Sequence, residues 1–208
     1  MFFKVIENFL PKQVFNRLLE TVENVEMTWA WYNSTAHVAL DLTQLKLQLI
    51  GKTLDEQKFL KIDDAVKTGD NNFMLNRMLF NHNNLAGGYY EDKQYAQLFY
   101  LISDYQHYVR SFGEVVKMKL NLYPNQGKNI KHGRHFDIPN GKEPDNKITT
   151  SVFNFHTCNG STVIELKDGK IEEVQSKANQ LIIFDNTWHY GITQSDIPRR
   201  IVLNVNVR

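Results

Sequence analysis

The second half of the chain consists of short runs in which apolar and polar residues alternate, and this pattern constrains the fold more than any other feature. A period of two places successive side chains on opposite faces of a strand. The runs that predict strands are 115–123, 148–155, 162–166, 171–174, 181–184 and 200–207. The turn-forming pairs Asn159-Gly160 and Asp168-Gly169 separate some of them. Short, closely spaced strands joined by turns indicate an antiparallel sandwich or barrel.

The first half, residues 1–112, mixes helical and extended patterns. Apolar residues recur three or four positions apart in segments 14–22 and 95–109, which is the spacing of one helix face. Three further runs predict strands: 2–6, 27–32 and 73–80. Residues 40–50 fit a helix or a strand, and residues 81–88 are typical of a polar loop. Helices gathered ahead of a strand-rich half predict an α+β, mainly β fold, with the N-terminal helices packed on one sheet.

Size and composition indicate one globular unit. The chain has 208 residues, enough for a sizeable core, and no Pro-, Gly- or Ser-rich linker divides it. We expect a single domain, 1–208, in which residues 1–112 support a core formed by residues 113–208. The 24 Lys and Arg nearly balance the 23 Asp and Glu, which disfavours a general nucleic-acid binder. Apolar runs fall far short of the ~20 residues of a membrane-spanning helix, and charge interrupts the first residues, so we expect a cytoplasmic protein without a membrane partner.

The histidines and carboxylates carry the strongest chemical signal. The single cysteine, Cys158, excludes a multi-thiolate metal site, so a metal would be held by histidine and carboxylate. His135 and Asp137 are two positions apart, and in an extended segment their side chains project to the same side. His189 follows a predicted buried strand and a short loop, after enough strands to run round a barrel and return. Two histidines and one carboxylate form the ligand set of mononuclear Fe(II) oxygenases.

Other residues have weaker signals. His132 lies three positions before His135, so strand parity puts it on the opposite face, in a supporting or surface role. Asn121 and one of Thr149 and Thr150 are candidates for lining a pocket, and Asp185 is a candidate for ordering the loop that carries His189. The loop 137–147 is rich in turn-forming residues and is a candidate lid.

A cation at the start of the last strand completes the set. Arg199 and Arg200 are both available, and strand alternation separates them. Arg199 shares its face with apolar residues, whereas Arg200 shares the more polar face with Asn204 and Asn206. The polar face of a small barrel would line the site, so we expect Arg200 there. A guanidinium can hold a carboxylate through two parallel hydrogen bonds.

The order His-x-Asp, distal His, then Arg on the final strand resembles the Fe(II)/2-oxoglutarate-dependent dioxygenases, and particularly their prolyl-4-hydroxylase-like branch. The resemblance covers roughly residues 113–207, and the opening strand followed by Asn8-Phe9-Leu10-Pro11 and a helix is also similar. It implies a double-stranded β-helix, or jelly roll. It matches His135, Asp137 and His189 to the Fe(II) ligands, Arg200 to the residue that binds the distal carboxylate of 2-oxoglutarate, and Tyr123 to a tyrosine that contacts this cosubstrate.

The same resemblance implies Fe(II) as cofactor and 2-oxoglutarate and O2 as cosubstrates, with no catalytic side chain beyond the metal ligands. The expected reaction is hydroxylation of a C–H bond with release of succinate and CO2, on a peptide, a nucleobase or a metabolite. An arginine at position 200, where that branch commonly has lysine, points to the broader superfamily. Two alternatives stay open: a cupin-like metal-binding jelly roll that does not use 2-oxoglutarate, and a non-catalytic β-sandwich binding module.

Overall fold

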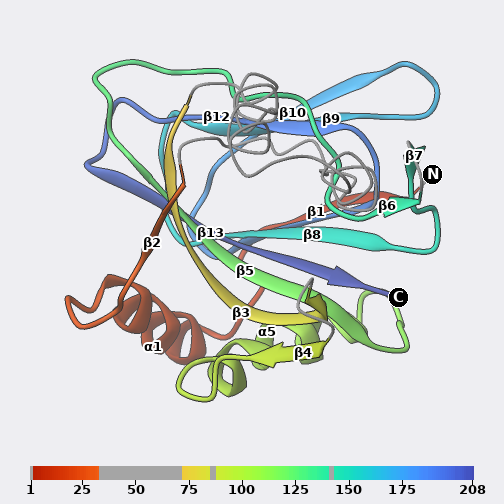
Figure 1. Ribbon diagram of the computed structural model, residues 1–208. Helices are drawn as coiled ribbons and strands as arrows, with labels where there is room; N and C mark the ends of the chain where they lie inside the picture. Colours follow the sequence, from red (N-terminus) through yellow and green to blue (C-terminus); the bar gives the residue numbers. More distant parts are fainter. Residues whose placement is uncertain (1, 33–71, 85–87, 141–142) are drawn as a thin grey trace, which may run out of the picture.

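A large antiparallel sheet is the central element of the fold (Figure 1). The computed structural model describes residues 2–32, 72–84, 88–140 and 143–208. Within them the sheet has the strand order β1-β11-β8-β13-β5-β3-β2, with β4 beside β3. The strands are β1 (Phe3–Ile6), β2 (Ala30–Tyr32), β3 (Met74–Asn84), β4 (Gly88–Glu91), β5 (Val115–Pro124), β8 (Thr149–Asn154), β11 (Gln180–Asp185) and β13 (Arg199–Val207).

A second, smaller antiparallel sheet lies over one face of the large one, at the top of Figure 1. Its strands are β10 (Ile171–Gln175), β9 (Ser161–Glu165) and β12 (His189–Ile192). A short hairpin of β6 (Pro139–Asn140) and β7 (Glu143–Pro144) stands apart from both sheets. Two opposed antiparallel sheets of this kind form the double-stranded β-helix that the sequence predicted.

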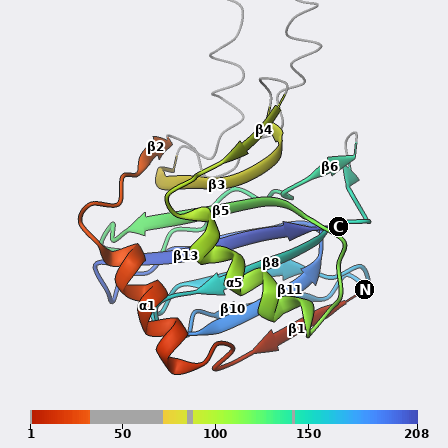
Figure 2. The same ribbon diagram turned by 90° about the horizontal axis from the view of Figure 1, so that it is seen from below.

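Two helices, α1 (Lys12–Glu23) and α5 (Ala96–His107), cover the other face of the large sheet, as Figure 2 shows from below. Each buries one stripe of apolar residues at helical spacing. In α1 this stripe is Phe15, Leu18 and Val22. The prediction of N-terminal helices packed on one sheet is therefore confirmed. Among the described residues, neither helix is long and apolar enough to cross a bilayer.

The alternation of β13 divides the core into two parts. Its odd-numbered residues, Ile201, Leu203, Val205 and Val207, belong to the main apolar core between the large sheet and the helices. The even-numbered Val202 belongs to a second, smaller apolar cluster between the sheets, with Val152, Ile164, Ile182 and Phe184. Full burial of each such side chain contributes ~1.5–3 kcal/mol. The small inner cluster leaves the rest of the space between the sheets to polar side chains.

The sequence prediction and the structure differ at several strands, and the short strands β4, β6 and β7 were not predicted. Residues 81–84, predicted as loop, continue β3 because neighbouring strands pair with them: Asn81 pairs with both β5 and β4, and Asn84 pairs with β4. Strand β12 was not predicted, since its four residues are too few to show a period. Only Ala30–Tyr32 of the predicted strand 27–32 is extended. The ambiguous segment 40–50 lies outside the described residues.

Candidate metal centre

His135 and His189 are brought together by their own backbones. The N–H of His135 donates to the carbonyl of His189 at 2.9 Å, and the N–H of His189 donates to the carbonyl of His135 at 2.8 Å. Residues paired in this way direct their side chains to the same face. The two imidazole centroids are accordingly 4.6 Å apart.

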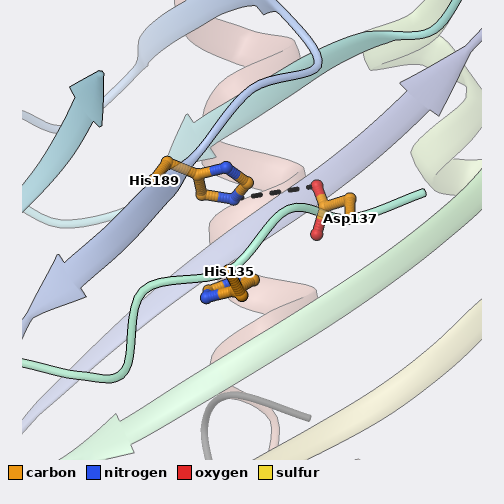
Figure 3. A group of neighbouring side chains, drawn as sticks. All are labelled: His135, Asp137 and His189. Atoms are coloured by element: carbon orange, nitrogen blue, oxygen red, sulfur yellow. Dashed lines mark ion pairs between the residues drawn. The ribbon is translucent and has the colours of Figure 1, made fainter. Parts of the chain in front are cut away.

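Asp137 follows His135 by two residues, and its carboxylate lies close to the two imidazoles (Figure 3). Its Oδ2 lies 3.9 Å from Nε2 of His189, and one ligand atom from each of the three residues lies within 4.8 Å of the others. Figure 3 shows the three side chains converging from the segment that carries His135 and from the start of β12. The convergence of His135 and Asp137 that the sequence predicted is what the structure contains.

The Nδ1 atom of each imidazole faces a backbone carbonyl, which leaves Nε2 as the atom that could coordinate a metal. Nδ1 of His135 lies 3.0 Å from the carbonyl of Gly133, and Nδ1 of His189 lies 2.8 Å from the carbonyl of Thr187. Since a carbonyl only accepts, Nδ1 carries the proton in each ring and Nε2 keeps its lone pair. Nε2 of His189 is buried and has no hydrogen-bond partner among the described residues. A divalent metal would provide the missing partner, so the residues fit a bound ion.

The Asp137 carboxylate is fixed from β13. The side-chain amide of Asn206 donates to Oδ2 of Asp137 at 2.9 Å and to the hydroxyl of Thr150 at 3.0 Å. The backbone N–H of Asp137 donates to Oδ1 of Asn186 at 3.3 Å. These contacts from both sides orient the carboxylate as outer-shell partners orient the ligands of a metal.

Electrostatics favour the metal-binding protonation states. Burial alone would raise the pKa of the Asp137 carboxyl, but the nearby His189, Lys117 and His135 hold it well below its usual range. Burial lowers the pKa of His135 to about 4, helped by the proximity of His189. At neutral pH the centre therefore offers a carboxylate and a neutral His135 imidazole, which are the forms that coordinate metals.

The centre opens into a pocket between the two sheets, which contains both His135 and His189. Arg200 lines this pocket and is only 2% exposed, whereas Arg199 is exposed and pairs with Glu23 at 3.3 Å. Tyr123 lies opposite Arg200 in the register of β5 and β13 and lines the same pocket. The even-numbered face of β13 thus faces the pocket, as the alternation predicted.

The guanidinium of Arg200 is already hydrogen bonded by the protein. Its two terminal nitrogens donate to the carbonyls of Ser161 and Ile192 at 2.9 and 3.2 Å, and to Asn154 Oδ1 and Thr162 Oγ1 at 3.2 and 3.1 Å. Only Nε is buried without a partner among the described residues. The free two-pronged fork expected from the sequence is therefore largely used to join the two sheets.

Two weaker expectations are corrected by the structure. His132 does not lie on the opposite face: it is buried in the pocket with its ring centroid 5.0 Å from that of Tyr123, because this segment has only isolated bridges and strand parity does not apply. Its expected supporting role is not contradicted. Asp185 accepts hydrogen bonds from the backbone of Phe2 and the side chain of Arg110, so it anchors β1 and does not order the loop before His189.

Other residues line the pocket or lie beside the centre. Asn121 lines the pocket, and Thr150 contacts Asn206. Asn204 lines the pocket as expected for the polar face of β13, whereas sequence reasoning missed Lys119, which also lines it. The alternation of β5 could have predicted this position, since Lys119 shares its strand face with Asn121 and Tyr123.

A jelly roll with two histidines and an aspartate between its sheets has the fold of the 2-oxoglutarate/Fe(II) oxygenases. No family model and no curated protein matches the sequence. Solved structures match the fold over 99% of this chain.

A prolyl-4-hydroxylase from Pseudomonas putida matches with a TM-score of 0.54, 14% identity and 91% of its own chain covered. An oxidoreductase of the 2OG-Fe(II) oxygenase family from Burkholderia pseudomallei matches with a TM-score of 0.61, 7% identity and 85% coverage. SnoN, a non-heme alpha-ketoglutarate-dependent epimerase of nogalamycin biosynthesis, matches with a TM-score of 0.57, 10% identity and 77% coverage.

Proposed function

We propose that this protein is an Fe(II)- and 2-oxoglutarate-dependent oxygenase whose metal ligands are His135, Asp137 and His189. The observation that carries the proposal is the convergence of these three ligand atoms within 4.8 Å, with an orphaned, buried Nε2 on His189. Two histidines and one carboxylate leave open positions on the ion, which a chelating cosubstrate and oxygen require. The fold similarity supports the same class.

Fe(II), 2-oxoglutarate and O2 together supply the oxidising chemistry, which converts the cosubstrate to succinate and CO2. The residues of the chain position the reactants. The Nδ1–carbonyl contacts of His135 and His189 leave Nε2 of each ring available to the metal, and Asn206 keeps the Asp137 carboxylate turned inward. No other side chain is needed as an acid or a base.

Arg200 and Tyr123 are proposed to bind the distal carboxylate of 2-oxoglutarate at the far end of the pocket. Arg200 offers its unpartnered Nε–H and its charge. The hydroxyl of Thr162 accepts a hydrogen bond from Arg200, so its own proton is available for the same carboxylate. Burial lowers the pKa of Arg200, but an arginine keeps its proton at neutral pH.

Hydroxylation of a C–H bond is the outcome we propose, on a substrate that is a peptide, a nucleobase or a metabolite. The similarity to a prolyl-4-hydroxylase supports this outcome. The similarity to SnoN makes epimerisation the second candidate, since its printed activity uses the same cosubstrate on a related fold. Product analysis separates the two, because hydroxylation adds one oxygen atom to the substrate and epimerisation adds none.

The test begins without oxygen. Addition of Fe(II) and then 2-oxoglutarate should produce a weak visible charge-transfer band, and subsequent addition of O2 should produce succinate. Asp137→Ala should abolish both signals, whereas Asp104→Ala, which removes an exposed carboxylate from α5, should abolish neither.

The rival readings predict other results. Metal binding without the band would support the cupin-like alternative, and absence of metal binding would support the non-catalytic module. Succinate release from Asp137→Ala at the parent rate would show that the ligand assignment is wrong.

A further inference from the structure

The pocket has a second cationic end, which the proposed function does not use. Lys119 projects from β5 into the pocket, opposite Asn204 of β13 in the strand register. Two residues along, Asn121 lies opposite Val202, and two further along, Tyr123 lies opposite Arg200. The pocket thus has a cation at each end: the ammonium of Lys119 on β5 at one end, and the guanidinium of Arg200 on β13 at the other.

The polar groups at the Lys119 end lack partners in the described part of the chain. Asn121 and Asn204 are only 3% and 9% exposed, and the Oδ1 atom of each is buried without a hydrogen bond. The half-buried side chain of Lys119 forms no hydrogen bond and no ion pair with the described residues. Buried polar groups in folded proteins are normally satisfied, so two unsatisfied amides that line one pocket beside an ammonium indicate a ligand.

A 2-oxoglutarate molecule bound at Arg200 is too short to contact Lys119 as well. Lys119 and Tyr123 are four residues apart on one strand, a backbone separation of about 13 Å. The five carbons of 2-oxoglutarate span at most about 6 Å, since each bond adds no more than ~1.5 Å. The metal centre lies toward the Lys119 end, because Asn206, two residues beyond Asn204, holds Asp137. An anion bound by Lys119 would therefore lie beside the reacting centre.

We propose that Lys119, Asn121 and Asn204 form the substrate subsite, and that the substrate carries an anionic oxygen group, a carboxylate or a phosphate, bound by Lys119. This inference rests on the proposed function. The ammonium supplies charge and the two amides supply donors and acceptors for the group and its neighbouring atoms. Lys117 lies on the same face of β5 and adds positive potential without a hydrogen bond or ion pair to the described residues.

The experiment measures binding and not turnover. The protein is loaded with Mn(II), saturated with 2-oxoglutarate and titrated at pH 7 with acetate, inorganic phosphate or acetamide. Proximity to the paramagnetic ion is read from the relaxation of ligand protons or phosphorus. Acetate or phosphate should relax at least fivefold faster than with metal-free protein, and uncharged acetamide should not. The probe that responds tells a carboxylate from a phosphate.

Variants test the assignment to Lys119. Lys119→Met should remove most of the enhancement while the affinity for 2-oxoglutarate stays within about twofold, and Lys119→Arg should restore part of it. Lys170→Met removes an exposed lysine that pairs with Glu172 on β10 and should change nothing.

Four outcomes would overturn the inference. An unchanged enhancement in Lys119→Met would mean that the anion coordinates the metal directly. Weakened 2-oxoglutarate binding in Lys119→Met, with acetate excluded by the cosubstrate, would assign Lys119 to the cosubstrate. No enhancement in a protein that binds Mn(II) and 2-oxoglutarate would refute the substrate subsite alone. Failure to bind Mn(II) would refute the proposed function itself, and this inference with it.

Discussion

Asn206 on the last strand donates its side-chain amide to Oδ2 of Asp137 at 2.9 Å, which ties the metal centre to the large sheet. The same amide contacts Thr150 on the neighbouring strand β8. The carboxylate of a loop residue is therefore oriented by a strand whose other face is part of the main core.

Asn206→Ala should weaken metal binding by 10- to 100-fold, the usual effect of removing an outer-shell partner. Titration with Mn(II), followed by electron paramagnetic resonance, measures the affinity. The unfolding free energy should also fall by about 1–3 kcal/mol, since Thr150 loses a buried contact. Asn24→Ala, at the end of α1, is the matched control. Parent-like affinity in a folded Asn206→Ala protein would mean that the hydrogen bond does not orient Asp137.

Arg200 should affect both stability and cosubstrate affinity. Its four hydrogen bonds join β9 and β12 of the small sheet to Asn154 of the large sheet. Arg200→Met leaves these acceptors without donors, so we expect a loss of about 3 kcal/mol or more from the unfolding free energy. Arg200→Lys keeps the charge and should fold better, with weaker 2-oxoglutarate binding.

Arg199→Met is the natural control, because its exposed pair with Glu23 contributes only about 0–1 kcal/mol. Urea denaturation and the charge-transfer titration measure the two effects. If Arg199→Met weakened 2-oxoglutarate binding more than Arg200→Lys, the two arginines would have been assigned in the wrong order.

Strand alternation predicted which residues of β13 face the pocket, since a period of two applies throughout a long, regular strand. The convergence of His135 and Asp137 on one point was predicted from the same rule. The rule failed for His132, whose segment contains only isolated bridges at Lys131 and His135. Nor could a sequence show that the two terminal nitrogens of Arg200 are already hydrogen bonded, because their acceptors come from strands that only the folded chain brings together.

Asp185 should make stability depend on pH in the acid range. Burial would raise its pKa, but hydrogen bonds from the backbone of Phe2 and from Arg110 outweigh burial and lower it. A carboxylate with a lowered folded-state pKa stabilises above the unfolded-state value of about 4 and loses this effect as the pH falls through the folded-state value.

Asp185→Asn should therefore reduce the unfolding free energy by about 1–2 kcal/mol at pH 7, and by much less near pH 3. Urea denaturation at both pH values gives the comparison, with Asp104→Asn on α5 as the control. An equal loss at both pH values would show that the packing of β1, and not the charge of Asp185, is responsible.

Lys119→Met should stabilise the protein while removing the proposed anion subsite. Burial, together with the nearby Lys117, lowers the pKa of Lys119 to about 8, well below its ordinary value of 10.5. At pH 7 the folded protein holds a partly buried ammonium that has no ion pair among the described residues, so its replacement by methionine should raise the unfolding free energy by about 1–3 kcal/mol.

The sign of the pH dependence is specific to this lysine. Between about pH 8 and 10.5 the unfolded chain binds the proton on Lys119 and the folded protein does not. The unfolding free energy of the wild type therefore rises with pH relative to that of Lys119→Met. Urea denaturation of the metal-free proteins at pH 7 and pH 9.5 should show the difference shrinking. Lys119→Met that is less stable than the wild type at pH 7 would mean that the ammonium already has a stabilising partner in the folded chain. Lys119 would then be a structural residue and not one held ready for a substrate.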